Sequence, residues 1–403
     1  SQKNEIDSIR NELKNEKDDT LRVQTLYFLS EALWRAGQYD TAISCADKSR
    51  ILSDKLGYKK GTAVAYTIYG IICEDKGDLD KAMQCHLKAL AINTEIKNKK
   101  GIAKNLYELG IVNDEQDNYS GALDYDTKAL ALFEEIGDKR SICNTYGEIG
   151  NVYNDEGNIP KALDFLFKAL TINRQINNKH GIATNLSNMG VLYHKQGNYP
   201  KAIECDSEAL VINNELGNKH GIATGLGNLG TVYHSLGNYP KTLQYHFKSL
   251  KMFEEMGAQR GISMSLTNIG DVYADEGREY SYKGIRADSV YENALEYFFK
   301  SLTISKKMSD KRLMAYTYTS IGIINMYLKN YKASREYHDS AIVYSKSIGE
   351  KEAIQGAYVG LAKLDSAVGN FKDALVNFKN YIIYRDSVVN ESNTKKTVQA
   401  EMN

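Results

Sequence analysis

The chain has 403 residues, of which 51 are basic and 51 acidic, so its formal net charge is zero. A chain without excess positive charge has no overall field to attract a phosphate backbone, and we therefore expect no nucleic-acid partner. The sequence also lacks a run of about 18 apolar residues, as a membrane-spanning helix needs, so we expect no membrane contact by this segment itself.

A unit of 40 residues recurs nine times along the chain. The repeats begin near residues 20, 60, 100, 140, 180, 220, 260, 312 and 352. One column holds a turn glycine at Gly37, Gly77, Gly157, Gly197, Gly237 and Gly277, with Asp117 in the third repeat. A fixed period of this length indicates one small supersecondary unit stacked on itself. We therefore expect a single solenoid over residues 20–386 rather than two or three separate domains.

Two apolar stretches with helical spacing flank the turn glycine of each repeat. In the fifth repeat they are Leu186, Met189, Leu192 and Tyr193, then Ala202, Ile203, Ala209, Leu210 and Ile212. The glycine can end the first helix, and Pro160, Pro200 and Pro240 suit the first turn of the second. One first-helix column is small, with Gly70, Gly110, Gly150, Gly190, Gly230, Gly270 and Gly322. The pattern predicts a helical hairpin whose two helices cross closely.

Three segments depart from the repeat. Residues 1–19 precede it and predict an N-terminal capping helix with Ile6, Ile9 and Leu13 on one face. The seventh repeat carries an insertion at 278–290, which we expect to be a surface excursion between its two helices. Residues 387–403 drop the repeat columns, and Val398 and Met402 have i, i+4 spacing, which predicts the start of a C-terminal linker helix.

The columns resemble the tetratricopeptide repeat family. The resemblance rests on Leu109 with Gly110, Leu229 with Gly230, the tyrosines Tyr153, Tyr193, Tyr233 and Tyr273, and the alanine pairs Ala162 with Ala169 and Ala202 with Ala209. It implies an all-α fold, a right-handed α-solenoid (superhelix) of about nine helical hairpins. The family's usual period is about 34 residues. The longer period is similar to the long-repeat branch that includes kinesin light chains and bacterial peptide-sensing regulators.

The resemblance places the binding groove on the exposed part of the first helices. The candidates are Glu108, Glu148, Asn188, Asn228 and Asn268, two residues before the small glycine, and Asn154, His194 and His234, four residues after it. An asparagine offers a donor and an acceptor at one tip, which suits an extended peptide backbone. The alternative is that the three asparagines satisfy neighbouring backbone or solvate a polar face. A clamp for a terminal carboxylate is not expected, because only Lys104 occupies a matching column.

The sequence matches to catalytic and metal-binding motifs lie outside the structural context that such motifs need. Residues 225–230 match GxGxxG but lie in the middle of a first helix, with no strand before them. The seven histidines follow the repeat columns, which sets them too far apart to ligate one ion. Cys45, Cys85 and Cys205 share a second-helix column with aromatic residues, and we interpret them as packing residues. We therefore expect no enzyme activity, no cofactor and no metal site.

These observations favour a protein- or peptide-binding module. Residues 387–403 and their placement resemble the segment after the repeats in bacterial receptors, where a tetratricopeptide sensor precedes a histidine kinase or an adenylate or guanylate cyclase. The first hypothesis is the sensor or scaffold part of such a receptor, in a periplasmic or extracytoplasmic location. The alternative is a cytoplasmic peptide-responsive regulator of a partner protein. A dimer through the C-terminal helix is compatible with the first.

Overall fold

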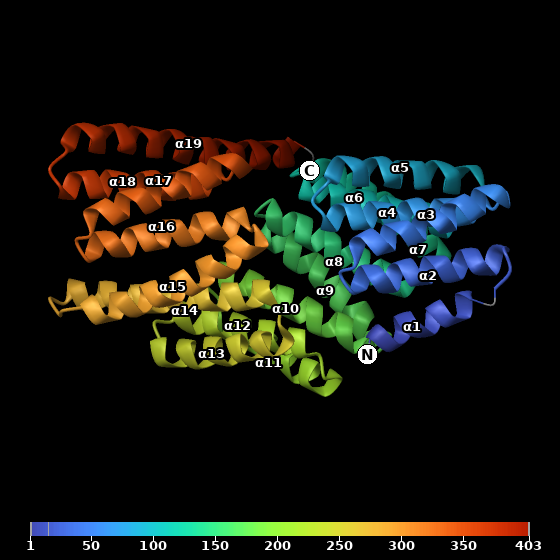
Figure 1. Cartoon of the computed structure of the whole chain (residues 1–403), viewed down its shortest axis with the longest axis horizontal. Coiled ribbons are helices and arrows are strands. Elements are labelled where there is room, and N and C mark those ends of the chain that lie inside the picture. Colours follow the sequence, from blue (N-terminus) through green and yellow to red (C-terminus); the bar gives the residue numbers. More distant parts are fainter. Residues whose placement is uncertain (1, 15, 402–403) are drawn as a thin grey trace. The chain divides into compact units, whose positions relative to one another are not determined.

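The structure is a computed structural model that describes residues 2–14 and 16–401, with side chains described over 4–14 and 16–388. These residues form nineteen α-helices and no strand (Figure 1). The chain divides into two compact units, Ser1–Gly181 and Ile182–Asn403, with the boundary inside α10. The all-α class and the solenoid expected from the repeats are confirmed.

The helices follow the repeats one pair at a time. The first unit contains α1 (Gln2–Leu13), α2 (Thr20–Arg35), α3 (Tyr39–Lys55), α4 (Lys59–Asp75), α5 (Leu79–Glu95), α6 (Lys99–Glu115), α7 (Tyr119–Ile136), α8 (Lys139–Asp155), α9 (Ile159–Gln175) and the start of α10 (Lys179–Lys195). The second contains α11 (Tyr199–Leu216), α12 (Lys219–Ser235), α13 (Tyr239–Met256), α14 (Gln259–Tyr282), α15 (Asp288–Met308), α16 (Lys311–Tyr327), α17 (Tyr331–Ile348), α18 (Lys351–Ala367) and α19 (Phe371–Glu401).

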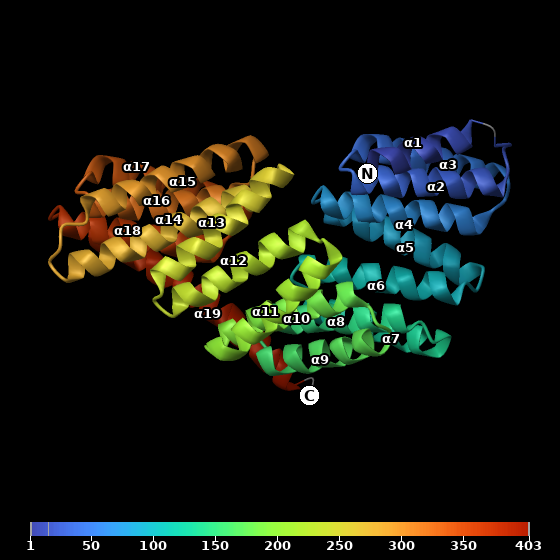
Figure 2. The ribbon, with the colours of Figure 1, turned by 90° about the horizontal axis from the view of Figure 1, so that it is seen from below.

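Consecutive hairpins stack within each unit (Figures 1 and 2). The two helices of a repeat contact each other, as α2 and α3 or α12 and α13 do. First helices also contact the first helix of the next repeat, from α2 through α4 and α6 to α8 and from α12 through α14 and α16 to α18. The first helices therefore form one continuous layer in each unit.

A glycine on each of seven first helices packs against one buried side chain of the second helix. The pairs are Gly70 with His86, Gly110 with Asp126, Gly150 with Leu166, Gly190 with Asp206, Gly230 with His246, Gly270 with Phe298 and Gly322 with His338. A Cβ atom on any of these glycines would lie 2.2 to 3.0 Å from that side chain. The partner side chains are at most 1% exposed. Glycine is therefore required by the close approach of the two helices.

The seventh repeat corrects two expectations. Gly277 lies inside α14 rather than in a turn, and the left-handed turn glycine is Gly284, with φ 73°. Gly277 is needed within the helix, because a Cβ there would lie 2.6 Å from the ring of buried Tyr291. The residues of the insertion at 278–290 lengthen α14 and begin α15, with a short turn between. The insertion is exposed over residues 281–286, as expected of a surface excursion, but it forms two longer helices joined by a short turn.

The described residues begin and end in helices. On α1, buried Ile6 joins a cluster with Leu29 and Leu33, and Ile9 and Leu13 pack against the same cluster. At the other end α19 continues from the last repeat to Glu401 without interruption. The expected side-chain pattern of Val398 and Met402 lies outside the described side chains, and the linker role stays a prediction. Within the described residues, no helix combines the length and the apolar character that crossing a bilayer requires.

One turn position offers a paired test of backbone strain. Lys97 has φ 53° where the preceding repeat has Gly57 with φ 62°. A Cβ at Gly57 would meet nothing within 4 Å, so a side chain there is penalised through φ alone. We predict that Lys97→Gly raises stability and Gly57→Lys lowers it, each by roughly 0.5–1 kcal/mol, because side-chain-bearing residues resist the left-handed region. Thermal denaturation checks this, and a lower melting temperature for Lys97→Gly would contradict it.

His338 predicts a pH dependence of stability. Its ring is fully buried between Gly322 and Gly360, and neither ring nitrogen has a hydrogen-bond partner among the described residues. Burial lowers the pKa of His338 from 6.5 to about 4. The neutral ring is favoured by folding, so its contribution to stability is complete above pH 6.5 and is lost as the pH falls towards 4.

We predict that His338→Phe removes part of the acid destabilisation, because Phe298 fills the same position in the preceding repeat. The measurement is the difference in melting temperature between pH 7.5 and pH 5, which should shrink in this variant. Replacement of the exposed His220 by Phe is the control and should leave the difference unchanged. An undiminished acid loss in His338→Phe would show that the buried ring does not titrate as described.

Candidate peptide-binding groove

The candidate binding residues lie on the first helices, two residues before the small residue of each repeat. The chemical type of the side chain in this column changes along the chain. In the first unit the column reads Phe28, Ile68, Glu108 and Glu148, and in the following repeats it reads Asn188, Asn228 and Asn268. The same backbone position therefore offers apolar, acidic and amide chemistry in turn. The predicted site residues fall in both units: Glu108, Glu148 and Asn154 in the first, and Asn188, Asn228, Asn268, His194 and His234 in the second.

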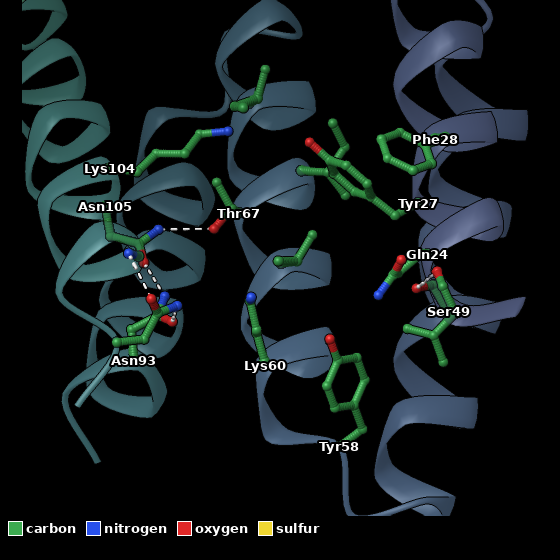
Figure 3. A pocket seen from close by; sticks show the side chains of 17 residues that line it. Gln24, Tyr27, Phe28, Ser49, Tyr58, Lys60, Thr67, Asn93, Lys104 and Asn105 are labelled. Carbon is green, nitrogen blue, oxygen red and sulfur yellow. Dashed lines mark hydrogen bonds between the residues drawn. The ribbon is translucent and has the colours of Figure 1, made fainter. Parts of the chain in front are cut away.

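The first unit contains a hollow of about 430 Å³ that α2, α4 and α6 border (Figure 3). Tyr27 and Phe28 of α2 form one wall, and Lys104 of α6 reaches towards the space from the other side (Figure 3). Phe28 is 53% exposed, so its ring is available to a ligand. Burial, aided by Glu31, raises the pKa of Tyr27 to about 12, which keeps its hydroxyl protonated.

A fixed amide network forms the polar side of this hollow. Asn105 Nδ2 donates to Thr67 Oγ1 at 2.8 Å, and Asn105 Oδ1 accepts from Asn93 Nδ2 at 2.8 Å. All three residues are buried, with exposed fractions of 1% for Asn105, 6% for Thr67 and 4% for Asn93. Because these side chains hold one another, the hollow combines an exposed aromatic wall with a fixed polar one.

A second hollow of about 230 Å³ lies along α6, where Lys104, Tyr107 and Glu108 line it with Phe133. Glu108 is only 8% exposed, so this candidate is more deeply placed than an outward-facing groove residue. Burial raises the pKa of Glu108, while neighbouring Lys104 acts in the opposite direction. Lys104 lines both hollows and therefore connects them.

Glu148 and Asn154 stand on α8 among other acids. Glu148 is half-buried and accepts a hydrogen bond of 3.4 Å from Asn151 Nδ2, and Asn154 Nδ2 donates to Asp155 at 2.9 Å. Burial, followed by the charge of Asp114, raises the pKa of Glu148 to about 7. In the described part of the chain, no group of His, Cys, Asp and Glu side chains is arranged to hold a metal ion.

Side chains four and five residues after the small position bridge neighbouring repeats. His194 Nε2 lies 2.8 Å from Ser235 Oγ, and His234 Nε2 lies 3.0 Å from Asp275 Oδ2. In the first unit Trp34 Nε1 donates to Asp75 at the same pair of columns. The two histidines are thus engaged with the next repeat, and burial lowers the pKa of each.

The asparagines of the second unit are half-buried rather than fully exposed. Asn228 Nδ2 donates to Asp206 Oδ1 at 3.4 Å, so one of its two amide hydrogens serves the fold. The contact supports the structural alternative in part for Asn228. Their binding role stays a prediction.

Sequence reasoning overlooked the aromatic hollow and the buried acid Asp126. The first hollow was not predicted, because the groove candidates were chosen among polar residues, whereas Phe28 and Ile68 are apolar members of the column of Glu108 and Glu148. Asp126 was missed because its column packs against the small glycine and was not among the columns considered for binding. The sequence contains one indication of this buried acid. Asp126 and Asp206 are acidic, whereas Leu166 and Phe298 in the same column are apolar.

Comparison with known proteins agrees with this architecture. The tetratricopeptide repeat family profile matches residues 21–95, 62–135 and 141–215. A search of curated proteins finds no sequence relative. Solved structures with the same fold include a Rap protein complexed with competence and sporulation factor, with a TM-score of 0.61 and 15% identity over 92% of this chain and 99% of that one.

Two further solved structures share the fold with similar TM-scores and sequence identities. The apo quorum sensor NprR from B. thuringiensis has a TM-score of 0.60 and 17% identity, covering 87% of this chain and 97% of its own. A signal-transduction ATPase with a tetratricopeptide repeat sensor from Pyrococcus horikoshii has a TM-score of 0.58 and 16% identity, covering 88% of this chain and 54% of its own. Residues 21–135 and 141–215 thus carry tetratricopeptide repeats, and serial helical hairpins of the same kind follow them in the described chain.

Proposed function

We propose that the chain is a non-catalytic protein- or peptide-binding module whose ligand lies along the first helices. The observation that carries the proposal is the hollow of about 430 Å³, which joins the exposed Phe28 ring to the fixed amides of Asn93 and Asn105. Apolar walls with a few placed polar groups are typical of ligand sites. The hollow suits one apolar side chain of an extended peptide.

The asparagines of the second unit extend this proposal along the chain. Asn188, Asn228 and Asn268 occupy one column on successive first helices, which provides a donor and an acceptor at each repeat. A peptide backbone needs both in alternation. The Rap protein solved with competence and sporulation factor supports the idea that this fold can hold such a ligand.

Within this function, the sensor or scaffold part of a bacterial signal-transduction receptor is our first assignment. The resemblance of residues 387–403 to the segment after such sensors supports it, as does the tetratricopeptide repeat sensor of the Pyrococcus horikoshii protein. The alternative is a cytoplasmic peptide-responsive regulator, which the fold of the quorum sensor NprR supports. The two assignments differ in compartment.

Compartment is measured by protease treatment of spheroplasts of the source cell. A receptor sensor outside the cytoplasm should be degraded while a cytoplasmic enzyme in the same sample survives. Survival of the chain until the cells are lysed would favour the cytoplasmic regulator.

The hollow is tested with peptides selected from a random octapeptide library on the immobilised chain. We predict that Phe28→Ala weakens the best peptide by roughly 10-fold, because an aromatic anchor in a pocket contributes about 1.4 kcal/mol or more. Phe167 is the matched control, since it is 47% exposed on the second helix α9, away from the hollow. Equal affinities of the two variants, measured by calorimetry, would remove the hollow from the binding site.

The asparagine column is tested separately, with library peptides that keep their affinity for the Phe28→Ala variant and therefore do not depend on the first hollow. We predict that the triple change of Asn188, Asn228 and Asn268 to alanine weakens binding by about 10 to 1,000-fold, at roughly 0.5–1.5 kcal/mol for each lost hydrogen bond. Gly190→Ala is the comparison, because a Cβ there would lie 2.5 Å from Asp206 and should lower the melting temperature first. A triple variant that binds normally, or melts as early as Gly190→Ala, would make the asparagines structural.

A further inference from the structure

Two repeats place different residues at one pair of contacting positions. In the second unit Asp206 of α11 lies beneath Gly190 and accepts a hydrogen bond of 3.4 Å from Asn228 of α12. Two repeats earlier in the chain the same positions hold Asp126 of α7, beneath Gly110, and Glu148 of α8. The amide that donates to the buried acid in one case is therefore replaced by a second acid in the other.

Asp126 has no donor to replace that amide. The residue is fully buried, and neither of its carboxylate oxygens has a hydrogen-bond partner among the described residues. The charged groups that act on Asp126 are Glu148 and Asp114, both acids, and burial together with these charges raises its pKa to about 8. A buried carboxylate without a donor or counter-ion is costly, so Asp126 is held in its neutral form and would be charged only beside a donor or a cation.

The side-chain pairs that bridge neighbouring repeats also lack a hydrogen-bond donor between the third and fourth repeats. Where other repeats pair Trp34 with Asp75 or His234 with Asp275, the third and fourth repeats set Asp114 against Asp155. Burial, followed by the charge of Asp155, raises the pKa of Asp114 to about 7, and its Oδ1 atom also lacks a partner among the described residues. Two independent columns of the repeat thus converge on an unbalanced acidic site around α6, α7 and α8.

We infer that Asp126 and Glu148, with Asp114 beside them, receive a cationic group of the bound peptide, namely a lysine, an arginine or a free amino terminus. The inference rests on the proposed function and names the ligand chemistry of the same groove. An ammonium or guanidinium group carries several N–H donors with its charge, and so supplies what Asn228 supplies to Asp206. The side chains of this site are not arranged for a metal ion.

The surroundings suit a side chain that enters from the groove. The second hollow, about 230 Å³, is lined by Tyr107 and Glu108 and also by the two bases Lys100 and Lys104. Charges of Glu148, Glu108 and Asp126 all act on the Tyr107 hydroxyl and, after burial, raise its pKa, which places Tyr107 next to the acids. Its ring offers an aromatic face of the kind that cations favour.

The two hollows set a length for the peptide. Contacting helices lie roughly 8–10 Å apart, and an extended chain rises about 3.3 Å per residue, so about three residues span one repeat. The first hollow centres on α4 and the acidic pair lies between α6 and α8. A peptide of about six to eight residues can therefore place an apolar side chain in the first hollow and a basic group at Asp126.

The experiment uses the full chain and two random octapeptide libraries, one with acetylated and one with free amino termini. We expect the selected peptides to be enriched in lysine or arginine in the acetylated library, or to require the free amino terminus in the other. Glu148→Gln and Asp126→Asn should weaken the best peptide by at least roughly 10-fold, as expected for loss of a charge-assisted contact. Asp124→Asn is the control, since this acid lies on α7 but is exposed and paired with Lys128 at 2.6 Å.

Two further measurements separate binding from folding. The melting temperature of Glu148→Gln should equal or exceed that of the wild type, because glutamine can donate to Asp126 as Asn228 does to Asp206. Binding of the basic peptide at pH 7 should release protons, because the acids retain protons in the free chain and lose them beside a cation. Calorimetry in two buffers of different ionisation enthalpy measures this release.

The outcomes distinguish the inference from the proposed function. Peptides selected without basic groups, unchanged affinity in Glu148→Gln and Asp126→Asn, or binding without proton release would overturn the cationic receptor while leaving the peptide-binding module intact. Failure of both libraries to yield a binding peptide would overturn the inference and the proposed function together. Enrichment of basic peptides that both acid variants lose, with Asp124→Asn unaffected, is the result that supports the inference.

Discussion

The contact between a first-helix glycine and one large buried side chain of the second helix fixes the hairpin in most repeats. The distance leaves no space for a Cβ atom, so each pair of helices is brought to a similar close crossing. The partner side chain is chemically unrestricted, since His86, Asp126, Leu166 and Phe298 all fill the space. Contact with the glycine is therefore what these side chains share, and an acid is tolerated where it can be held neutral.

This division of labour leaves the outer columns free to vary. One column on the first helices passes from Phe28 and Ile68 through Glu108 and Glu148 to a series of asparagines, while the first helices from α2 to α12 keep nearly the same length. The packing residues and the proposed binding residues thus occupy different positions within the repeat. Asp126 is the exception, because it belongs to the packing column yet interacts with a residue of the groove column. Such a residue links the stability of a hairpin to what occupies the face beside it.

The repeat period was sufficient to predict the helices, because turn and packing residues recur in register with it. The seventh repeat could not be predicted in this way. Gly277 occupies the turn column, but twelve added residues move the turn to Gly284 and leave Gly277 facing Tyr291. The sequence shows where a glycine falls in the repeat. It does not show whether the glycine is needed for a left-handed φ or for close packing of helices.

Burial of the candidate site was equally inaccessible from the sequence. Columns on the first helices were expected to be exposed, yet Glu108 is almost completely covered and Asn228 turns towards Asp206. Exposure depends on the neighbouring repeat, whose side chains cover part of each first helix. Only an alignment of contacting positions, such as Asp206 with Asn228 against Asp126 with Glu148, shows where an expected partner is replaced by a like charge.

The unbroken helix α19 can convert a small rotation at its first turns into a larger displacement at its far end. Its 31 residues extend about 46 Å at 1.5 Å per residue, and its first turns pack on α18. A rigid rod pivoting at one end magnifies motion at the other, so a tilt of about 5° at its base would move the far end by about 4 Å. A small repacking of the last hairpin would thus become a displacement as large as a side chain at the end of the helix.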